Sequence, residues 1–518
     1  MTSQIIRWSL PVLLAAASIG GLVTSRGLIA PAPGPAVASS SPAQARLEPI
    51  VAHARPGQWS SLLAWAVRAN VTVLAANQRA GILVIAVSKN RLSAVARAAA
   101  PLTDVLSVSG AKAAAASVAD ITLSPSPMLD YAPLVQRGLI GLDTHATGAG
   151  QTIAIIGWGD AISDADLSAW ALGTGEPLIA EGLGAGKVQW IPLLGGSAMT
   201  SQGAQAELAM DVEYAHAMAP QATIRVYLAP DRCDSSGCLG DWAGLEAAVT
   251  VAVADGAKII AGSWGGLESD LSTDGTGALE PVLQAAAQVG VSFFFASGDV
   301  GSAGGVEYPA SSPWAVAVGG ATLNPGQPRS ALGLAAWSRS GGGCSSLFAR
   351  PSWQPAVLAG CANRAVPDLA LDGDPNTGAP VYLSYGGQRG WLLGGGTSLA
   401  APMAAALYAD ACAEVSCGWA NPTLAKADLQ PGAYSPVLTG SNGAYQAGAG
   451  WNAVTGWGVP NWPIWLTALG GVPVSQVVSA APAGPTSTPA APAPAATVVP
   501  PTPTATKIAR LPRGSRMS

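Results

Sequence analysis

The stretch GGGTSLAAP, residues 394–402, leads a run of glycines into a hydroxyl residue and then into a helix of small residues, expected from Ser398 to about Cys412. Glycine lets the backbone approach another group closely. The amino terminus of a helix adds unpaired N–H groups and the positive end of a dipole, which stabilise an oxyanion. Pro402 falls about one turn into the helix, where a missing N–H need not break it. Ser398 is therefore a candidate nucleophile, and a glycine-rich turn that only caps the helix is the alternative.

The histidines do not supply an obvious base for this serine. Two of the three, His53 and His145, lie before the first core strand in segments without a catalytic setting. His216 lies on a helix expected at 203–219, on roughly the opposite side from its acidic residues. A hydroxyl nucleophile in this chain would need a base of another kind.

That helix, GAQAELAMDVEYAHAMA, is expected to end before Pro220. At about 100° per residue, one narrow stripe of it carries four residues, Glu207, Asp211, Tyr214 and Met218. Like charges at i,i+4 destabilise a helix, and 203–219 contains no Lys or Arg to offset the pair. The pattern favours two carboxylates that share a proton, and a solvated acidic face is the alternative.

A third acidic residue follows a short apolar strand. Residues 291–296 are apolar, and the loop SGDVG that comes next contains Asp299. In open α/β sheets, ligands bind at the carboxyl ends of the strands, so Asp299 is a candidate site residue. An aspartate that only caps a turn is the alternative.

The fold class follows from the alternation of elements. Apolar strands are expected at 152–157, 222–228, 258–262, 291–296 and 314–318. Helices are expected between and after them, at 203–219, 242–254, 276–289 and 398–412. This order predicts an α/β fold with a doubly wound, mostly parallel sheet and helices on both faces. Residues 39–125 are expected to form a separate small α+β domain, with strands near 71–76 and 81–87 and helices near 58–69 and 91–100.

The two ends of the chain indicate export. Residues 1–38 read as a signal peptide, with Arg7, a largely apolar run at 8–23, and Ala36 and Ala38 at an A-x-A cleavage site; an uncleaved anchor is the alternative. Residues 473–518 are rich in Pro, Ala and Thr, which is typical of a disordered spacer. We expect a secreted protein, with attachment to the cell surface as a second option.

Six cysteines fall into three pairs that are close in sequence: Cys233 and Cys238, Cys344 and Cys361, and Cys412 and Cys417. In an exported chain they suggest disulfides, although six cysteines allow fifteen connectivities. No histidine lies near any pair, which disfavours a metal site.

Charged residues make up 11% of the chain and the net charge is −5, so the composition gives no support to nucleic-acid binding.

Taken in order, Glu207, Asp211, Asp299 and Ser398 resemble the sedolisin family of serine-carboxyl peptidases, and its kumamolisin-like members in particular. The resemblance covers most of residues 126–466. It depends on a set of motifs: AELAMDVEYAHAMAPQATIRVYLAP at 206–230, SWGG at 263–266, ASGD at 296–299, GGTS at 395–398, YQAGAGW at 445–451 and TGWG at 455–458. Each motif is weak alone, and their order and spacing together are specific.

The resemblance implies a role for each of these residues. Ser398 would be the nucleophile, Glu207 the general base, and Asp211 the residue that orients Glu207 and shares its proton. Asp299 would be protonated and would donate a hydrogen bond to the oxyanion, with the Ser398 backbone N–H as a second donor. The implied substrate-binding positions are Trp264, Gly265, Gly395 and Gly396.

The family also implies an organisation and an activity. The chain would have a signal peptide at 1–38, a propeptide at 39–125, a subtilisin-like peptidase domain at 126–472 and a tail at 473–518. It would be a monomeric zymogen that cleaves polypeptides, with its own propeptide as intramolecular inhibitor. Carboxylates near their ordinary pKa work best in acid, so activity is expected to peak at about pH 3–5. An inactive, surface-tethered peptide-binding protein on the same scaffold is the alternative.

An ordinary subtilisin mechanism is not expected. It needs an aspartate at the end of the first strand and a histidine in an HGTH-like run, whereas this chain has Gly157 at that place and no such run. Gly157 also replaces the outer carboxylate found in many sedolisin relatives, although Asp160 is close in sequence.

The family's calcium site also departs from its pattern. Pro436 and Asn452 stand where aspartates are expected, which would leave Asn452 and the carbonyls of Val437, Gly448 and Gly450 as ligands. Ca²⁺ prefers several charged oxygens, so we expect weak or absent binding and no required cofactor.

Overall fold

The structure is a computed structural model that describes residues 47–78, 81–108, 112–113, 123–126, 131–142, 145–193, 201–234, 237–271, 278–323, 333–355 and 361–470. All of them belong to one compact unit, Arg46–Ser518. The predicted signal peptide at 1–38 and the predicted tail at 473–518 lie outside the described residues. Within the described ranges, no helix combines the length and the apolar character needed to cross a membrane.

Among the described residues, nine strands form the main sheet. Their order is β17-β16-β14-β12-β6-β9-β8-β7, and β20 pairs with β16. All neighbouring pairs are parallel except β16 with β17. The strands are β6 (Thr152–Trp158), β7 (Ala180–Glu181), β8 (Lys187–Pro192), β9 (Thr223–Ala229), β12 (Ile259–Gly262), β14 (Ser292–Ala296), β16 (Val316–Leu323), β17 (Leu334–Ala336) and β20 (Leu369–Asp372). The predicted mostly parallel α/β sheet is confirmed.

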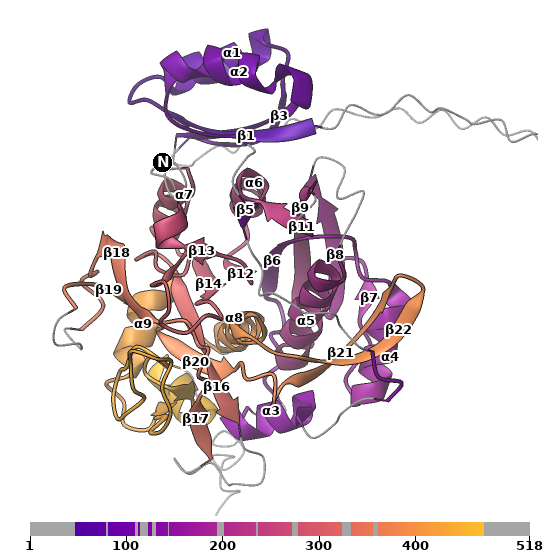
Figure 1. Ribbon diagram of the computed structural model, residues 1–518, viewed down its shortest axis with the longest axis vertical. Coiled ribbons are helices and arrows are strands. Elements are labelled where there is room, and N and C mark those ends of the chain that lie inside the picture. Colours follow the sequence, from indigo (N-terminus) through magenta and orange to yellow (C-terminus); the bar gives the residue numbers. More distant parts are fainter. Residues whose placement is uncertain are drawn as a thin grey trace, which may run out of the picture. The chain divides into compact units, whose positions relative to one another are not determined.

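Helices cover both faces of this sheet because its strands are apolar on both sides. Ile153 and Ile155 of β6 belong to a core cluster that contains residues of α5 (Gln202–Met218) and α8 (Thr397–Glu414). Ala154 and Ile156 point to the other face and pack with α6 (Trp242–Ala254) and α7 (Leu279–Ala287). The predicted cover of helices on both faces is therefore confirmed (Figure 1).

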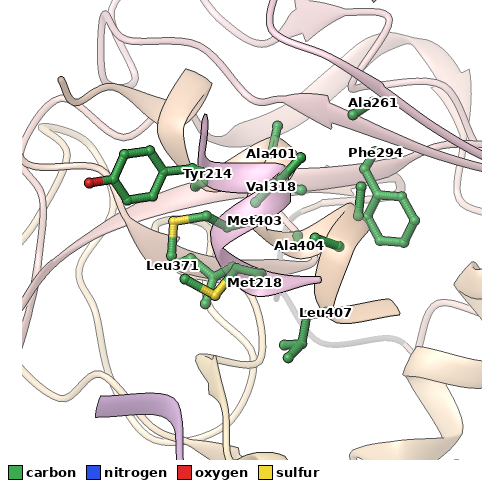
Figure 2. Packing of buried hydrophobic residues seen from close by; sticks show 14 of the residues in the cluster. Tyr214, Met218, Ala261, Phe294, Val318, Leu371, Ala401, Met403, Ala404 and Leu407 are labelled. Atoms are coloured by element: carbon green, nitrogen blue, oxygen red, sulfur yellow. The ribbon is translucent and has the colours of Figure 1, made fainter. Parts of the chain in front are cut away.

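The core on the α8 side positions the nucleophile candidate. Figure 2 shows Met403 of α8 in the same cluster as Met218 of α5 and Phe294 of β14. α8 is buried from Thr397 to Ala411, and its many alanines let the helix lie close to the sheet. The hairpin of β21 (Ala379–Tyr385) and β22 (Gln388–Gly394) leads directly into α8. The first turn of α8 is therefore fixed by both the main sheet and the hairpin.

The amino-terminal described region is a small α+β unit, as predicted. Its antiparallel sheet has the order β2-β3-β1-β4. The elements are β1 (Leu47–Ala54), α1 (Trp59–Arg68), β2 (Thr72–Asn77), β3 (Ile82–Ser88), α2 (Leu92–Ala99) and β4 (Thr103–Val108). The two predicted helices and strands are present, whereas β1 and β4 were not predicted. Both unpredicted strands carry a charged residue, which weakens the apolar pattern.

The remaining elements are short or peripheral. Two of them, α3 (Pro133–Ile140) and α4 (Asp164–Thr174), precede α5 and α8 in the chain. The others are β5 (Lys112–Ala113), β10 (Asp231–Asp234), β11 (Gly237–Asp241), β13 (Gly266–Leu267), β15 (Glu307–Tyr308), β18 (Gly343–Ala349), β19 (Asn363–Val366), α9 (Ala420–Ala427), β23 (Tyr434–Ser435), β24 (Val459–Pro460) and α10 (Trp462–Ala468), with short 3₁₀ turns at Lys89–Arg91, Ala100–Leu102 and Glu268–Asp270.

Two of the three expected disulfides are present. Cys344 bonds to Cys361, and Cys412 bonds to Cys417 at the carboxyl end of α8. Cys233 and Cys238 face each other in the register of the β10–β11 hairpin, and their side chains lie outside the described part of the structure. The pairing of cysteines that are close in sequence is confirmed for the two described pairs.

Candidate active site

Ser398 lies in the first turn of α8 and its side chain is buried. The helix begins one residue earlier than predicted, at Thr397, after Gly396 as N-cap with φ 86°. A Cβ at position 396 would collide with Oδ2 of Asp299, so glycine is needed both for the backbone conformation and for the approach of that carboxyl group. The glycine run therefore brings an acid from another loop next to the helix terminus.

The acid pair is enclosed by protein. α5 starts after Ser201, whose hydroxyl accepts the N–H of Ala204 at 3.1 Å, and every residue from 204 to 218 is buried. Glu207 is 7% exposed and Asp211 is 2% exposed. The alternative of a solvated acidic face is therefore wrong.

Burial changes the chemistry of both acids. It raises the pKa of Asp211 to about 8, against the hydrogen bond from Ser263, which lowers it. Burial also raises the pKa of Glu207, and the neighbouring charge of Asp211 adds to the increase. Hydrogen bonding to the Ser398 hydroxyl acts in the opposite direction. Among the described residues, no cation contributes to either pKa shift. The state in which the two carboxyl groups share one proton is therefore favoured over the state in which both are ionised.

Ser263 was missed by the sequence reasoning. It follows β12 at the carboxyl edge of the sheet, within the SWGG motif, and it is 3% exposed. Its Oγ lies 2.6 Å from Oδ1 of Asp211 and 3.1 Å from the backbone oxygen of Ser398. Its place directly after a buried strand was the available signal, the same signal that identified Asp299.

Asp299 lies after the carboxyl end of β14, as predicted, and contacts the start of α8. Its Oδ1 accepts hydrogen bonds from the N–H and the hydroxyl of Thr397, both at 2.8 Å. Burial raises the pKa of Asp299, while these bonds and the charge of Arg339 lower it. Because Oδ1 is held as an acceptor, Oδ2 is the oxygen suited to carry a proton, and it is the one that faces Gly396.

A cleft of about 500 Å³ adjoins these groups. Glu207, Asp299, Gly395 and Gly396 line it, together with further residues that are mostly apolar: Ala206, Met210, Trp337, Ser338, Arg339, Asp374, Pro375, Asn376, Leu392, Leu393 and Gly394. Its volume is within the range of ligand pockets. Gly395 and Gly396, predicted as substrate-binding positions, therefore do lie on a cleft.

Trp264 and Gly265, the other two predicted binding positions, do not line this cleft. Trp264 is buried, packs edge to face on Phe295 at 5.4 Å between ring centroids, and donates its indole N–H to the carbonyl of Ile156 at 3.1 Å. It lines a separate, smaller cavity behind the acids, together with Gly157. The ring therefore supports the acid pair from behind.

Gly157 ends up beside that smaller cavity, where its lack of a carboxylate leaves the acid pair without an outer partner. Asp160 does not replace it, because its side chain is exposed. Oε1 of Glu207 is buried and makes no hydrogen bond with any residue that the structure describes.

The histidine prediction agrees with the structure for His216. Its ring is buried against Trp170, and Nε2 lies 3.0 Å from the carbonyl of Pro177. Burial lowers the pKa of His216 to about 4. Neither this ring nor His53 or His145 lines the cleft or the cavity behind the acids.

The carboxy-terminal loop does not fit a calcium ion. The Nδ2 group of Asn452 points at three carbonyl oxygens, those of Gly448 at 3.3 Å and of Gly450 and Gly456 at 3.5 Å. Its Oδ1 accepts the N–H groups of Val454 and Thr455. An amide N–H donor repels a cation and occupies the carbonyls that would bind it. In the described ranges, no cluster of three His, Cys, Asp or Glu residues could hold a metal.

Removal of divalent cations is therefore expected to leave thermal stability unchanged. The Tm of the purified protein in EDTA should match its Tm in excess Ca²⁺, because the side chain of Asn452 already forms hydrogen bonds with the carbonyl and N–H groups of the loop. The matched variant Pro436→Asp/Asn452→Asp, which restores the expected acids, should gain a Tm that rises with Ca²⁺. A Tm of the parent protein that falls in EDTA would contradict the interpretation of this loop.

The chain is similar in sequence to known peptidases. The model of the subtilase family matches residues 196–458. Kumamolisin from Bacillus sp. (strain MN-32) is 33% identical over 366 residues, which cover 64% of this chain and 62% of kumamolisin. Sedolisin from Pseudomonas sp. (strain 101) is 35% identical over 246 residues, 42% of this chain and 41% of sedolisin. The chain thus spans less than two thirds of the length of either relative.

A solved structure extends the similarity to the fold. The structure of Pseudomonas sedolisin, a serine-carboxyl proteinase in complex with pseudo-iodotyrostatin, superposes with a TM-score of 0.54 at 28% identity. The superposition covers 67% of this chain and 98% of that one. The subtilase model and the similarity to sedolisin agree with the subtilisin-like fold described above, and the chain belongs to the sedolisin family of serine-carboxyl peptidases within the subtilase superfamily.

Proposed function

We propose that this chain is a secreted, acid-acting peptidase that hydrolyses peptide bonds through an acyl-enzyme on Ser398. The observation that carries the proposal is the convergence of three segments at the carboxyl edge of the sheet. Ser263 contacts both Asp211 and the backbone of Ser398, and Asp299 is bonded to the residue before Ser398. Of the acids that meet here, Glu207 and Asp299 line the cleft.

Acylation would use these groups in sequence. The Ser398 oxygen attacks the carbonyl carbon of the peptide bond while its proton passes to Glu207. The tetrahedral intermediate then collapses, the C–N bond breaks, and Glu207 returns the proton to the leaving amine. Water releases the acyl group by the same steps, again with Glu207 as base. Asp211 shares the proton of Glu207 and holds it in orientation, as aspartate does for histidine in other serine peptidases.

Asp299 would stabilise the oxyanion. Its Oδ1 is occupied by Thr397, so a proton on Oδ2 can be donated to the developing charge. The backbone N–H of Ser398 at the start of α8 is a second donor. This role requires a protonated carboxyl group, which burial favours.

The pH dependence of hydrolysis tests this assignment. Because burial raises the pKa of Asp299, the acid keeps its proton above the usual value of about 4 and loses it as pH rises further. We expect kcat/KM on a fluorogenic peptide to be highest in acidic solution, where Asp299 keeps its proton, and to decline as that proton is lost towards higher pH. The free protein should remain folded by circular dichroism across the range tested. A profile that peaks near pH 8 would exclude the mechanism.

The cleft suggests how a polypeptide would bind. Met210, Pro375 and Leu392 give it apolar surface next to Glu207, which suits an apolar side chain beside the scissile bond. Profiling a peptide library with the matured protein would define the preference, and would separate internal cleavage from release of tripeptides.

Synthesis as a self-processing zymogen is part of the proposal. The small α+β unit within 39–125 has the position of a propeptide that would inhibit the peptidase within the same chain. The segment that follows, with Ser124, pairs with Trp391 of β22, a strand whose Leu392 and Leu393 line the cleft. Processing near Ser124 would cut the chain beside this strand. An inactive peptide-binding protein on the same scaffold is the alternative, and it would show neither processing nor turnover.

A further inference from the structure

Ser263 connects the three parts of the candidate site. It follows β12, and its hydroxyl contacts Asp211 of α5 and the backbone of Ser398 in α8. The two distances are 2.6 Å to Oδ1 of Asp211 and 3.1 Å to the oxygen of Ser398. The hydroxyl of Ser263 is therefore engaged by protein groups on both sides, and Ser263 itself does not line the cleft.

The chemistry of these contacts allows two arrangements. A serine hydroxyl has one hydrogen to donate and can also accept, whereas a backbone carbonyl can only accept. When Asp211 is ionised, Ser263 donates to Oδ1. When Asp211 carries a proton on Oδ1, that proton is donated to Ser263, and the Ser263 hydrogen turns to the carbonyl of Ser398. Both arrangements use the same positions of the heavy atoms.

We infer that Ser263 is a positioning residue whose hydroxyl keeps the Glu207–Asp211 pair hydrogen-bonded in each protonation state through which catalysis takes it. The inference rests on the function proposed above and adds a residue to it. During acylation the pair gains the proton of Ser398 and afterwards loses it. Ser263 can follow this change by rotation of its hydroxyl hydrogen alone, so α5 and α8 need not repack against each other.

The surroundings of the pair leave this task to Ser263. On α5, the charge of Asp211 raises the pKa of Glu207. The other groups that shift the pKa of Glu207 are Ser398 of α8, Asp299 after β14 and Ser263 itself, and the one hydrogen bond that shifts the pKa of Asp211 comes from Ser263. Gly157 of β6 lines the small cavity behind the acid pair, and it has no charged side chain. A buried carboxylate that loses its hydrogen-bond donor is disfavoured as an anion.

The variant Ser263→Ala tests the inference through the pH profile. Without the donor, the ionised pair is less stable, so its first ionisation moves up in pH. We expect the acidic limb of kcat against pH to move upwards by roughly one to two units, the range that one hydrogen bond to a charged group supports. KM should change little because the Ser263 hydroxyl contacts Asp211 and the Ser398 carbonyl. Ser263→Thr keeps the hydroxyl and should restore the acidic limb.

Ser292→Ala is the matched control. Ser292 is also buried and its hydroxyl also joins two groups, both of them in the backbone: it donates to the carbonyl of Gly418 and accepts the N–H of Ala420. It begins β14, at the strand end opposite Asp299. This variant should lose stability without any shift of the acidic limb. If Ser263→Ala lowers activity by one factor at every pH, as the control would, Ser263 is only structural and the inference is overturned.

A second measurement separates this inference from the proposed function. Carboxyl ¹³C NMR of the full chain, with labelled aspartate and glutamate, follows the titration of the acid pair whether or not the protein hydrolyses peptides. If the wild type has no peptidase activity, the proposed function fails, and an upward shift of the pair in Ser263→Ala still supports the contact. An unchanged titration of the pair in that variant overturns the inference in either case.

Discussion

The Ser398→Ala variant is expected to lose peptide hydrolysis by about 10⁶-fold in kcat, because the Ser398 oxygen forms the acyl-enzyme in the proposed mechanism. Ser398 is held in the first turn of a buried helix, and its hydroxyl lowers the pKa of Glu207. Alanine removes one oxygen from this place and leaves the packing of α8 intact. The measurement is turnover of a fluorogenic peptide at about pH 4, beside conversion of the full chain to a shorter form.

Mixing the two proteins separates chemistry from folding. Wild-type enzyme added to the Ser398→Ala variant should shorten it, and the variant alone should stay at full length. Their circular dichroism spectra should coincide. A Ser398→Ala protein that still matures alone at acid pH would show that the nucleophile lies elsewhere in the chain.

The second large effect is expected from Glu207→Gln. Glutamine keeps the shape of the side chain, but it cannot take the proton of Ser398. We expect kcat to fall by roughly 10⁴-fold or more, as when the base of a catalytic triad is removed. Steady-state kinetics at about pH 4, with KM determined separately, measures the effect and distinguishes loss of turnover from loss of binding.

Glu213→Gln is a matched control on the same helix. Glu213 is fully buried, and burial raises its pKa as it does for Glu207. Its carboxyl group accepts the N–H of Tyr382 in β21, away from Ser398. The control should therefore lower Tm while keeping kcat within a small factor of wild type. Equal losses of kcat in the two variants would mean that buried charge on α5 matters only for folding.

Much of this fold could be predicted from the sequence because its strands are continuous apolar runs. β6, β12 and β14 are buried on both faces, so their patterns are unambiguous. β8 and β20 were not predicted. β8 mixes Lys187 and Gln189 with apolar residues, and β20 has only four residues, Leu369–Asp372, that end on an acid. Such strands form because their neighbours in the sheet are already in place.

The site was predicted in part, for a different physical reason. Glu207 and Asp211 were recognised because an acid pair without a cation is unusual, although the stripe interpretation of α5 was too narrow. The helix is buried on every side, between the sheet, α8 and the β21–β22 hairpin. Periodicity cannot reveal this, because it assumes one solvent-facing side. Ser263 was missed because a serine after a strand has no pattern until the helices that it contacts are positioned.

The burial of Asp211 links folding to proton uptake. In the unfolded chain its carboxyl group is hydrated and ionises near 3.8, whereas the folded protein holds the proton up to about 8. Between these values the native state binds more protons, so the contribution of Asp211 to stability is complete at low pH and diminishes as pH rises towards 8. The proton that the acid pair holds in the folded protein is therefore taken up when the chain folds around Asp211, and acidic solution favours that uptake.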